Sequence, residues 1–492
     1  MGSIVPLEAL SARPTSRDRM PSQNTLGCPS SGCHSDPRGQ TLTTEVEDKI
    51  HDHPCYSEEA HQYYARMHVA VAPACNIQCN YCNRKFDCAN ESRPGVVSER
   101  LTPEQAARKV MAVASRVPQL SVLGIAGPGD ACCNFDDVRR TFELVRRNIP
   151  DLKLCVSTNG LGLVDCIDAL VDLDVTHVTI TINMVDPEVG QHIYPWVYFR
   201  HRRWTGLEAS KILHDRQMEG LEALTSRKIL VKVNSVMIPG INDEHLLEVH
   251  KVVSDKGIVL HNVMPLISDP AHGTRFGLSG QREPTHEELA RLRDRLGSGA
   301  RAMRHCRQCR ADAVGMLGED LGAQFTMDRI KDSEAYDPSA RDAYRVVAER
   351  ERSEHQGFKR MIQQRLKSVS TGPTVMVGVA SKGGGRINEH FGHAKEFHVF
   401  EVSPNGVRLI GQRKVPNYCQ GGWGNDDSID AIVDLMRGVT ALLCAKVGEC
   451  PRSTLAEAGI EVCDTYAHAW LEEGIANWYL DTYAISSVEK TA

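Results

Sequence analysis

Residues 68–82 read HVAVAPACNIQCNYC, and this stretch decides how the rest of the chain is interpreted. An apolar run that predicts a short buried strand, His68–Ala74, leads directly into Cys75, Cys79 and Cys82. Because an iron–sulfur cube is ordinarily held by four thiolates, the spacing Cys-x3-Cys-x2-Cys leaves one iron with an open coordination position. An open position on a metal is where a substrate binds and reacts.

The three-cysteine motif, with the aromatic Tyr81 directly before its last cysteine, resembles the signature of radical S-adenosylmethionine (SAM) enzymes. The resemblance implies that the cysteines hold a [4Fe–4S] cluster whose open iron binds the amino and carboxylate groups of SAM. The alternative is a zinc or redox cysteine cluster, but zinc sites favour Cys-x2-Cys pairs on both sides. The motif therefore favours SAM activation at an iron–sulfur cluster.

Composition narrows the class of protein further. The 492 residues predict two or three domains, and 41% hydrophobic with 24% charged residues is typical of a soluble globular chain. A net charge of −6 argues against nucleic-acid or membrane partners, and we expect a cytoplasmic protein because neither a secretory signal nor an apolar run of about 20 residues is found. In such a chain, 17 cysteines indicate metal ligation rather than disulfides, and hence a reducing compartment.

The pattern of predicted elements divides the chain into four parts. Residues 1–45 are rich in Ser, Pro, Gly and Thr and are expected to be a disordered tail. Residues 50–320 alternate strands and helices and form the predicted radical SAM core. Residues 325–372 are predicted to be a charged helical linker, and residues 373–492 a second α/β domain.

Six strands are predicted in the core, with amphipathic helices between several of them. The strands are His68–Ala74, Ser121–Ala126, Leu152–Ser157, His177–Ile182, Ile229–Ile238 and Ile258–Met264, and the helices include Pro103–Ser115, Phe135–Arg147 and Ala209–Leu224. This alternation predicts a parallel sheet with right-handed crossovers. Spacing alone leaves a doubly wound sheet open, and the cysteine motif after the first strand favours an incomplete (β/α)6 barrel of the TIM type.

The second domain is predicted to begin near Pro373. Strands are expected at Thr374–Ala380 and Thr440–Lys446, with a hairpin around Pro404-Asn405-Gly406 between them. The predicted helices are Ser428–Met436, Ser453–Ala458 and Trp470–Thr482.

A glycine-rich turn, GIAGPGD (Gly124–Asp130), follows the second predicted strand. Glycines let the backbone approach a ligand, and exposed amides can receive a polar head group. Radical SAM enzymes bind the amino group of SAM with a turn at this position, so the resemblance implies that role for Gly127, Pro128, Gly129 and Asp130. By the same resemblance, residues near later strand ends are expected to contact SAM: Ser157, Asn159, Thr179, Thr181, Val231 and Asn234.

Further cysteines and histidines predict additional metal sites. HCRQCRADAVG (His305–Gly315) holds Cys306 and Cys309 among arginines, which favour thiolates and can neutralise an anionic cluster. Two thiolates do not complete a site, so Cys88 is predicted to join them. A second site is predicted from the run His51–His68. Its members are Cys55 and His53, with His51 or His61 as alternatives to His53 and Cys155 as a further thiolate.

Five segments together resemble the radical SAM family that makes the nitrogenase iron–molybdenum cofactor: HPCYSEEAH, APACNIQCNYCNRKFDCANESRPGVVSE, GIAGPGD, LCVSTNGL and HCRQCRADAVG. The second domain, with VASKGGGRINEHFGHAKEFHVFEV, is similar to the NifX-like nitrogenase-cofactor-binding domain. That similarity implies a smaller ribonuclease-H-like α/β fold. One departure is ACC at Ala131–Cys133, where some relatives have Pro-Leu-Ala, so Cys132 and Cys133 are not expected to be ligands.

The family resemblance implies a reaction on iron–sulfur clusters. Two further [4Fe–4S] clusters are the substrates, and one SAM donates its methyl group to a cluster sulfide. A second SAM yields a 5′-deoxyadenosyl radical that takes hydrogen from that methyl. The carbon becomes the central carbide as the clusters fuse, with one extra sulfur, into the [8Fe–9S–C] precursor of the nitrogenase cofactor. The implied partners are cluster-assembly and sulfur-delivery proteins, an electron donor such as ferredoxin, and a downstream carrier and maturation scaffold.

Other interpretations stay open at this point. His390, His393 and Cys419 in the second domain are candidate ligands of the product cluster, but a structural role is equally compatible with the histidine pair. Cys166, Cys444, Cys450 and Cys463 are expected to be buried thiols. The alternative functions are another radical SAM enzyme with auxiliary clusters, or a non-catalytic iron–sulfur scaffold or carrier.

Overall fold

In a computed structural model of the chain, the described residues are 43–83, 97–296, 301–330, 336–367, 372–416, 418–420, 423–424 and 426–483. The described residues from Thr44 onward belong to one compact unit. All but the last three residues of the predicted tail lie outside the described residues, and so does Cys88. Within the part of the chain that is described, no helix is long and apolar enough to cross a membrane.

Six parallel strands lie side by side in sequence order in the larger sheet. They are β1 (Ala65–His68), β3 (Leu120–Ile125), β4 (Lys153–Thr158), β5 (His177–Thr181), β8 (Leu230–Met237) and β9 (Leu260–Pro265). Two short strands flank them, β10 (Arg301–Ala302) parallel to β9 and β11 (Val314–Gly315) antiparallel to β1. The sheet confirms the predicted α/β class with an incomplete six-strand barrel.

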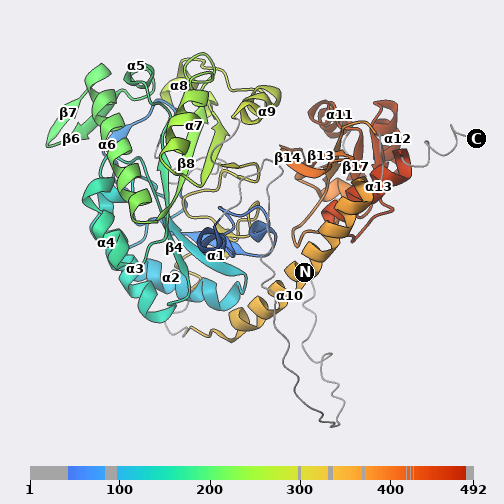
Figure 1. The fold of residues 1–492 in the computed structure, drawn as a ribbon, viewed down its shortest axis with the longest axis horizontal. Helices are drawn as coiled ribbons and strands as arrows, with labels where there is room; N and C mark the ends of the chain where they lie inside the picture. Colours follow the sequence, from blue (N-terminus) through green and yellow to red (C-terminus); the bar gives the residue numbers. More distant parts are fainter. Residues whose placement is uncertain are drawn as a thin grey trace, which may run out of the picture. The chain divides into compact units, whose positions relative to one another are not determined.

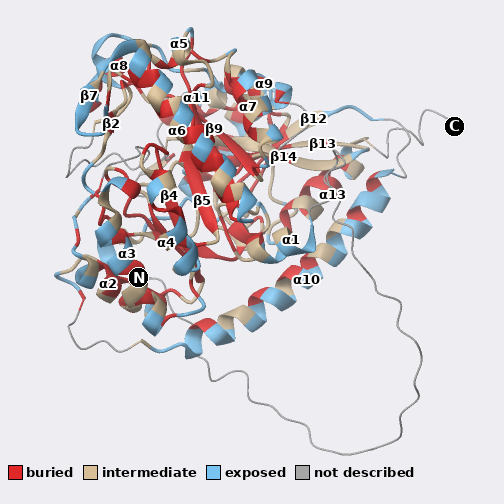
Figure 2. Ribbon diagram, turned by 60° about the vertical axis from the view of Figure 1, so that its left-hand side comes forward, coloured by how far each residue is buried: buried red, intermediate tan, exposed pale blue. Residues whose placement is uncertain are grey.

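Helices cover the outer face of this sheet (Figure 1). They include α2 (Pro103–Arg116), α3 (Phe135–Asn148), α4 (Ile167–Asp172), α6 (Gly206–Ser226), α7 (Leu246–Asp255) and α9 (His286–Arg295). Helix α2 begins at a capping box in which Thr102 and Gln105 satisfy each other's backbone amides, and its Val110 and Val113 face the core. Buried residues concentrate in the strands, whereas the helices expose their outer faces (Figure 2).

The first strand lies earlier than predicted. The structure places β1 at Ala65–His68, whereas the prediction was His68–Ala74, so those boundaries are wrong. The residues after His68 are buried but leave the ladder, and Ala72 makes only an isolated bridge to Pro128. Burial, rather than pairing, therefore explains the apolar run that leads to the cysteines.

A small antiparallel sheet beside the cysteine loop was not predicted. It joins β2 (Ile77–Gln78) to β6 (Trp196–Phe199) and β7 (Arg202–Trp204). Its strands are too short for a periodic pattern to reveal them.

The charged stretch predicted as a linker contains helix α10 (Ser339–Lys367). One of its faces is buried. Arg341 is 1% exposed and donates to the carbonyl of Leu120 at 3.1 Å, whereas Leu366 joins the core of the second domain. Helix α10 therefore packs against both domains along its length.

The second domain is a mixed α/β fold, as predicted. Its sheet has the order β14-β13-β12-β17-β18, with β12 antiparallel to β13 and parallel to β17. The strands are β12 (Val375–Val379), β13 (Glu396–Ser403), β14 (Gly406–Lys414), β17 (Ala441–Leu443) and β18 (Glu461–Cys463), and the helices are α11 (Asp426–Leu435), α12 (Glu449–Glu457) and α13 (Leu471–Tyr483). Strand β18 was not predicted, because three residues carry too little pattern.

Candidate active site

The three cysteines of the opening motif share one loop. Gln78 holds this loop together, since its Nε2 donates to the carbonyls of Cys79 and Cys82, both at 2.9 Å. The amide of Cys82 also donates to the carbonyl of Cys79 at 3.2 Å. Cys75, Cys79 and Cys82 are all partly exposed. Three thiols on one ordered, accessible loop fit a resident [4Fe–4S] cluster, whose ordinary ligands are thiolates.

The glycine-rich turn packs directly on the segment that leads to Cys75. The amide of Gly129 donates to the carbonyl of Ala72 at 2.6 Å, and that of Asp130 to the carbonyl of Ala74 at 2.8 Å. A Cβ atom on Gly129 would lie 2.0 Å from the Ala74 oxygen, so only glycine fits there. The turn therefore places its backbone, including Gly127 and Pro128, beside the cysteine loop.

The carboxylate of Asp130 accepts several hydrogen bonds from other residues of the chain. It is buried, and it accepts hydrogen bonds from the amide of Asn159 at 2.6 Å and from the Thr158 hydroxyl. It also accepts from the amides of Cys132 and Cys133, at 3.0 and 3.1 Å. Asp130 thus ties the loop after β3 to the end of β4, and burial raises its pKa.

Asn159 reaches the cysteine loop. Its Nδ2 lies 3.7 Å from the Cys75 sulfur and donates to Oδ1 of Asn76 at 2.7 Å. Tyr81 belongs to the same loop, and its hydroxyl accepts from Nδ2 of Asn183 at 2.8 Å. A narrow cavity beside Tyr81 and Cys82 extends to Gln308. These contacts place Asn159 and Tyr81 next to the predicted cluster.

The other residues predicted to contact SAM lie in three different places. Ser157 and Thr179 are register partners on neighbouring strands. Oδ1 of Asn234 accepts from Nδ2 of Asn262 at 3.1 Å, and the same Nδ2 also donates to the Cys306 sulfur. Val231 is fully buried in the hydrophobic core that the sheet shares with the helices.

A second group of thiols lies inside the barrel. Arg66 on β1 donates to the Cys309 sulfur from Nε at 3.3 Å and from Nη2 at 3.1 Å. Asn262 on β9 donates to the Cys306 sulfur at 3.2 Å. The two sulfurs of the Cys-x2-Cys pair are therefore each held by a side chain from a different strand.

Cys55 and Cys155 belong to the same interior. Burial raises the pKa of the Cys55 thiol, the Lys232 ammonium opposes this rise, and the neighbouring thiols of Cys309 and Cys306 add to it. Burial likewise raises the pKa of Cys155 to about 12, again opposed by Lys232. The structure thus places Cys55 near Cys155 and near the pair Cys306 and Cys309, with Lys232 near Cys55 and Cys155.

His53 is a buried, neutral histidine beside Cys55. Its Nδ1 accepts the amide hydrogen of Cys55 at 3.2 Å, and its ring packs 4.3 Å from that of His177 and 4.7 Å from that of Tyr56. Its Nε2 is buried and has no hydrogen-bond partner among the described residues. Burial, and then the charge of His177 and Lys232, hold the pKa of His53 well below its usual value. Because Nδ1 accepts, the neutral ring carries its hydrogen on Nε2, so Nε2 would bind a metal only if Nδ1 gave up this hydrogen bond and took the proton.

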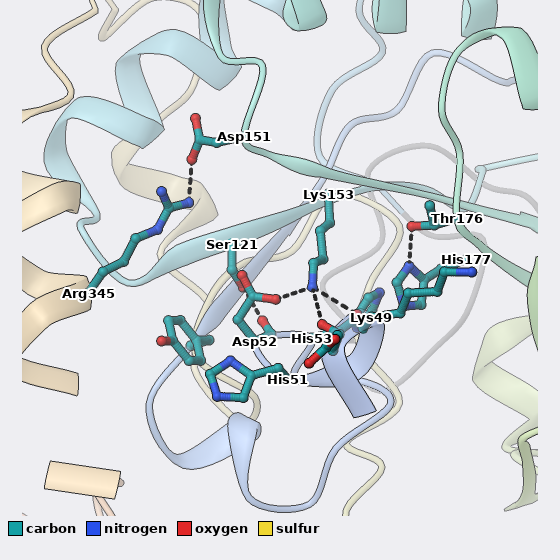
Figure 3. A network of polar contacts seen from close by, with 12 residues as sticks. Lys49, His51, Asp52, His53, Ser121, Asp151, Lys153, Thr176, His177 and Arg345 are labelled. Atoms are coloured by element: carbon teal, nitrogen blue, oxygen red, sulfur yellow. Dashed lines mark hydrogen bonds and ion pairs between the residues drawn. The ribbon is translucent and has the colours of Figure 1, made fainter. Parts of the chain in front are cut away.

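Polar contacts at the amino ends of the strands anchor the loop that carries His53 (Figure 3). Lys153, the first residue of β4, pairs with Asp52 and donates to the carbonyl of Lys49 at 2.8 Å. Ser121 on β3 donates to the carbonyl of Asp52 at 2.6 Å. The loop is thereby fixed at the edge of the sheet opposite the SAM cysteines.

The two alternatives to His53 have other contacts. His51 is half-exposed and lies 3.2 Å from a carboxylate oxygen of Glu349 on α10. His61 is buried and stacks on His305, with ring centroids 5.0 Å apart. His305 adjoins Cys306 in sequence, so His61 lies on the Cys306 side of the interior.

A third cluster of ligand atoms lies in the second domain. Ligand atoms of His390, His393 and Cys419 all lie within 4.8 Å of one another. The amide of Gly392 donates to Nδ1 of His390 at 3.0 Å, and a Cβ on Gly392 would lie 2.3 Å from the Cys419 sulfur. The glycine therefore permits the close approach of the thiol to both imidazoles.

The thiols expected to be buried are not all buried. Cys166 and Cys444 are buried and Cys463 is partly exposed, but Cys450 lies exposed on α12, so that prediction was wrong for Cys450. A cysteine near the start of a short surface helix gives no sequence signal of its side-chain direction.

Arg66, Lys232 and Asn262 were not identified from the sequence. Each is a polar residue on a strand that is otherwise apolar, within ARMH, LVKVNSVM and LHNVMP. A charged residue inside a buried strand is the signal that could have found the first two, because such residues are rarely buried without a partner.

Two family models match the chain: the radical SAM superfamily over residues 69–253 and dinitrogenase iron-molybdenum cofactor over residues 373–480. With the cysteine loop and its glycine-rich turn, these matches define a radical SAM enzyme, and that superfamily implies a [4Fe–4S] cluster and SAM. The FeMo cofactor biosynthesis protein NifB of Sinorhizobium fredii is 56% identical over 99% of both chains. NifB of Rhizobium meliloti is 59% identical over 90% of this chain and 91% of its own. The chain belongs to the NifB family of FeMo cofactor biosynthesis proteins.

Proposed function

We propose that this chain fuses two [4Fe–4S] clusters, with a carbide from SAM and one extra sulfur, into the [8Fe–9S–C] precursor of the nitrogenase cofactor. The observation that carries the proposal is that the thiols of four cysteines lie inside the same barrel: Cys55, Cys155, Cys306 and Cys309. Four thiols beside two buried cations, Arg66 and Lys232, suit anionic clusters whose charge must be balanced away from water.

The resident cluster, held by Cys75, Cys79 and Cys82, supplies the electron that cleaves SAM reductively when both are bound. The chain's own residues position that chemistry. Asn159 holds the Cys75 side of the loop, and we assign the amino-acid part of SAM to the glycine-rich turn, whose backbone packs on the segment before Cys75. The hydroxyl of Tyr81 accepts a hydrogen bond from Asn183, which fixes the Tyr81 side chain of the same loop.

The substrate clusters would react as follows. One SAM transfers its methyl group to a cluster sulfide and leaves as S-adenosylhomocysteine. A second SAM takes one electron and separates into methionine and a 5′-deoxyadenosyl radical, which removes a hydrogen atom from that methyl group. The two remaining hydrogens of that carbon would leave as protons, the irons of the two clusters would supply the electrons that take it to carbide, and the clusters would close around it.

A small number of protein ligands at each site suits substrate clusters, because these clusters must rearrange and leave. A permanent cluster is ordinarily held by four thiolates, whereas among the described residues one site has the thiols Cys306 and Cys309, and the other has Cys55, Cys155 and one His53 nitrogen. The predicted third thiolate of the first site, Cys88, lies outside the described residues. We therefore assign Cys306, Cys309 and Cys88 to one substrate cluster, and Cys55, His53 and Cys155 to the other.

The second domain would hold the product after synthesis. His390, His393 and Cys419 offer two imidazoles and a thiol within one small volume. Such a mixed donor set binds iron without enclosing it. The partners of this scheme are cluster-assembly and sulfur-delivery proteins, an electron donor such as ferredoxin, and a downstream carrier and maturation scaffold.

Anaerobic iron quantification with electron paramagnetic resonance on single variants tests the proposal. Cys75→Ala should abolish SAM cleavage and keep the substrate clusters, whereas Cys306→Ala should keep the resident cluster and lose the eight-iron product. Cys133→Ala is the matched control, because that thiol is exposed and lies outside both sites. Normal nitrogenase maturation by Cys306→Ala would contradict the assignment of the substrate cluster.

The nucleoside products separate the two alternative functions from this one. Release of 5′-deoxyadenosine without S-adenosylhomocysteine would indicate a different radical SAM enzyme with auxiliary clusters. Failure of the reduced protein to cleave SAM at all would indicate a scaffold or carrier.

A further inference from the structure

A cavity of about 770 Å³ adjoins Cys306. Its walls come from the Cys306–Gln308 loop, from α9 and from the β13–β14 hairpin of the second domain. Its volume falls within the range of roughly 300–1,000 Å³ that is usual for ligand sites. It shares Met264, Pro265 and Gln308 with the narrow cavity beside Tyr81 and Cys82, so the two spaces adjoin.

Gln308 lies at the boundary between the two cavities and lines both of them. It stands between Cys306 and Cys309 in sequence and adopts a left-handed backbone conformation, with φ of 50°. Its side-chain amide donates to the carbonyl of Pro265 at 3.4 Å. A cluster held at Cys306 therefore has the larger cavity beside it and the narrow cavity of Tyr81 and Cys82 beyond Gln308.

The larger cavity is lined by an excess of positive charge. Six of its lining side chains are Arg or Lys and three are Asp or Glu. Two of the carboxylates are engaged, since Asp294 pairs with Arg304 at 2.7 Å and Glu396 with Arg307 at 2.8 Å. The remaining positive charge favours an anionic occupant.

Three of the arginines also have unused donors. The Nε atoms of Arg293, Arg304 and Arg307 are buried and have no hydrogen-bond partner among the described residues. Burial lowers the pKa of Arg293 to about 10, which leaves it a cation at neutral pH. Buried donors without a partner are uncommon, because each costs free energy until a ligand satisfies it.

We propose that this cavity is an exit chamber, in which the anionic eight-iron product binds beside Cys306 before it leaves the chain. Sulfide-rich clusters accept N–H···S hydrogen bonds, and Arg66 shows the same donor chemistry toward the Cys309 sulfur. The identity of the ligand rests on the proposed function. The existence of the cavity, its positive charge and its unpaired N–H donors do not depend on the proposed function.

The first experiment tests the chamber without turnover. Full-length protein with all its clusters reconstituted is titrated with a synthetic [4Fe–4S] dianion that carries 2-hydroxyethanethiolate ligands. Arg293→Gln should weaken binding about tenfold, the usual lower effect of losing a supporting contact to a metal centre. Lys414→Gln, on the exposed rim of the opposite wall, should weaken it less and serves if Arg293→Gln fails to fold.

The matched control is Arg295→Gln on the same helix. Arg295 is half-exposed and pairs with Glu244 at 2.8 Å, away from the lining residues, so binding should stay unchanged. Equal binding by wild type, Arg293→Gln and Lys414→Gln would overturn the proposal. Full displacement of the probe by an equal concentration of inorganic phosphate would also overturn it, because the site would then be a general anion site.

The second experiment follows the product itself. After one round of turnover and gel filtration, the eight-iron product that stays with the chain is measured per product formed. Arg293→Gln should retain several-fold less than wild type and Arg295→Gln, whereas equal retention would overturn the exit chamber. If wild type forms no eight-iron product, the proposed function fails, and the dianion titration still decides the cavity by itself.

Discussion

Arg66 points two N–H groups at the sulfur of Cys309, from Nε at 3.3 Å and from Nη2 at 3.1 Å. Arg66 is 2% exposed, and its guanidinium also donates to the carbonyls of Gly315 and Glu319. One buried cation on β1 thus fixes a thiol and the segment that follows it. This contact links the first strand of the barrel to the last cysteine pair of the domain.

Replacing Arg66 should separate SAM cleavage from cluster fusion. Arg66→Met removes the charge and both donors beside Cys309, so the yield of eight-iron product should fall about tenfold or more, as for other supporting residues of metal sites. Cleavage of SAM depends on a different loop and should persist. Arg66→Lys keeps the charge but loses the paired donors, and it should recover part of the yield. Equal yields from wild type and Arg66→Met would contradict a positioning role.

Gly129→Ala should remove the resident cluster. The added Cβ would lie 2.0 Å from the Ala74 oxygen, so the turn or the cysteine segment must move. We expect a loss of about 1–3 kcal/mol in the free energy of unfolding, the usual cost of overpacking, together with one [4Fe–4S] cluster fewer per chain. Denaturant unfolding and iron content measure the two effects.

The same substitution at Gly357 is the control for Gly129. Gly357 is exposed within α10, and nothing lies within 4 Å of the position that a Cβ atom would take, so alanine meets no obstacle there. Because glycine is a poor helix former, Gly357→Ala should stabilise the protein by about 0.5–1 kcal/mol. Iron loss in this variant would show that cluster content follows stability in general rather than the turn.

Proton uptake by His261 in the unfolded chain should lower the free energy of unfolding in mild acid. Its Nε2 lies 2.9 Å from the Ser235 hydroxyl and its Nδ1 3.0 Å from Nδ1 of His250, and burial followed by the charge of His250 lowers its pKa to about 3. The unfolded chain binds the proton below about pH 6.5, so stability is full above that pH and falls between pH 6.5 and 3.

Urea unfolding at several pH values measures this contribution. His261→Gln removes the titrating group, and the slope of stability against pH between 6.5 and 3 should decrease by up to about 1.4 kcal/mol per pH unit. His201→Asn is the control, because His201 is exposed and asparagine tolerates its left-handed backbone, with φ of 58°. An unchanged slope in His261→Gln would contradict the assignment.

Gly392→Ala should disrupt the ligand cluster of the second domain. Its Cβ would lie 2.3 Å from the Cys419 sulfur, which must then move away from His390 and His393. In a Co²⁺ titration, the thiolate-to-metal absorption band should disappear and the affinity should fall about tenfold or more. Gly411→Ala is the control, since nothing lies within 4 Å of a Cβ at that position. Retention of the band in Gly392→Ala would show that Cys419 is not a ligand.

Much of the fold followed from local pattern. The five strands after the first, and helices such as α2 and α3, are close to their predicted ranges because apolar periodicity and capping residues act over a few neighbours. The first strand was misplaced because Val69–Ala72 is buried outside the regular ladder, with only an isolated bridge at Ala72, and burial alone gives an apolar run the appearance of a strand.

By itself the sequence determined the chemistry of the opening loop. Three thiols at Cys-x3-Cys-x2-Cys spacing lie within eight residues, so covalent connectivity keeps them close whatever the fold does. Only the tertiary structure decided which distant groups meet: Cys55 with Cys155 and Lys232, Arg66 with Cys309, and Arg293 with the cavity beside Cys306. Those groups come from different strands and loops, and parallel strand packing, rather than spacing along the chain, sets the distances between them.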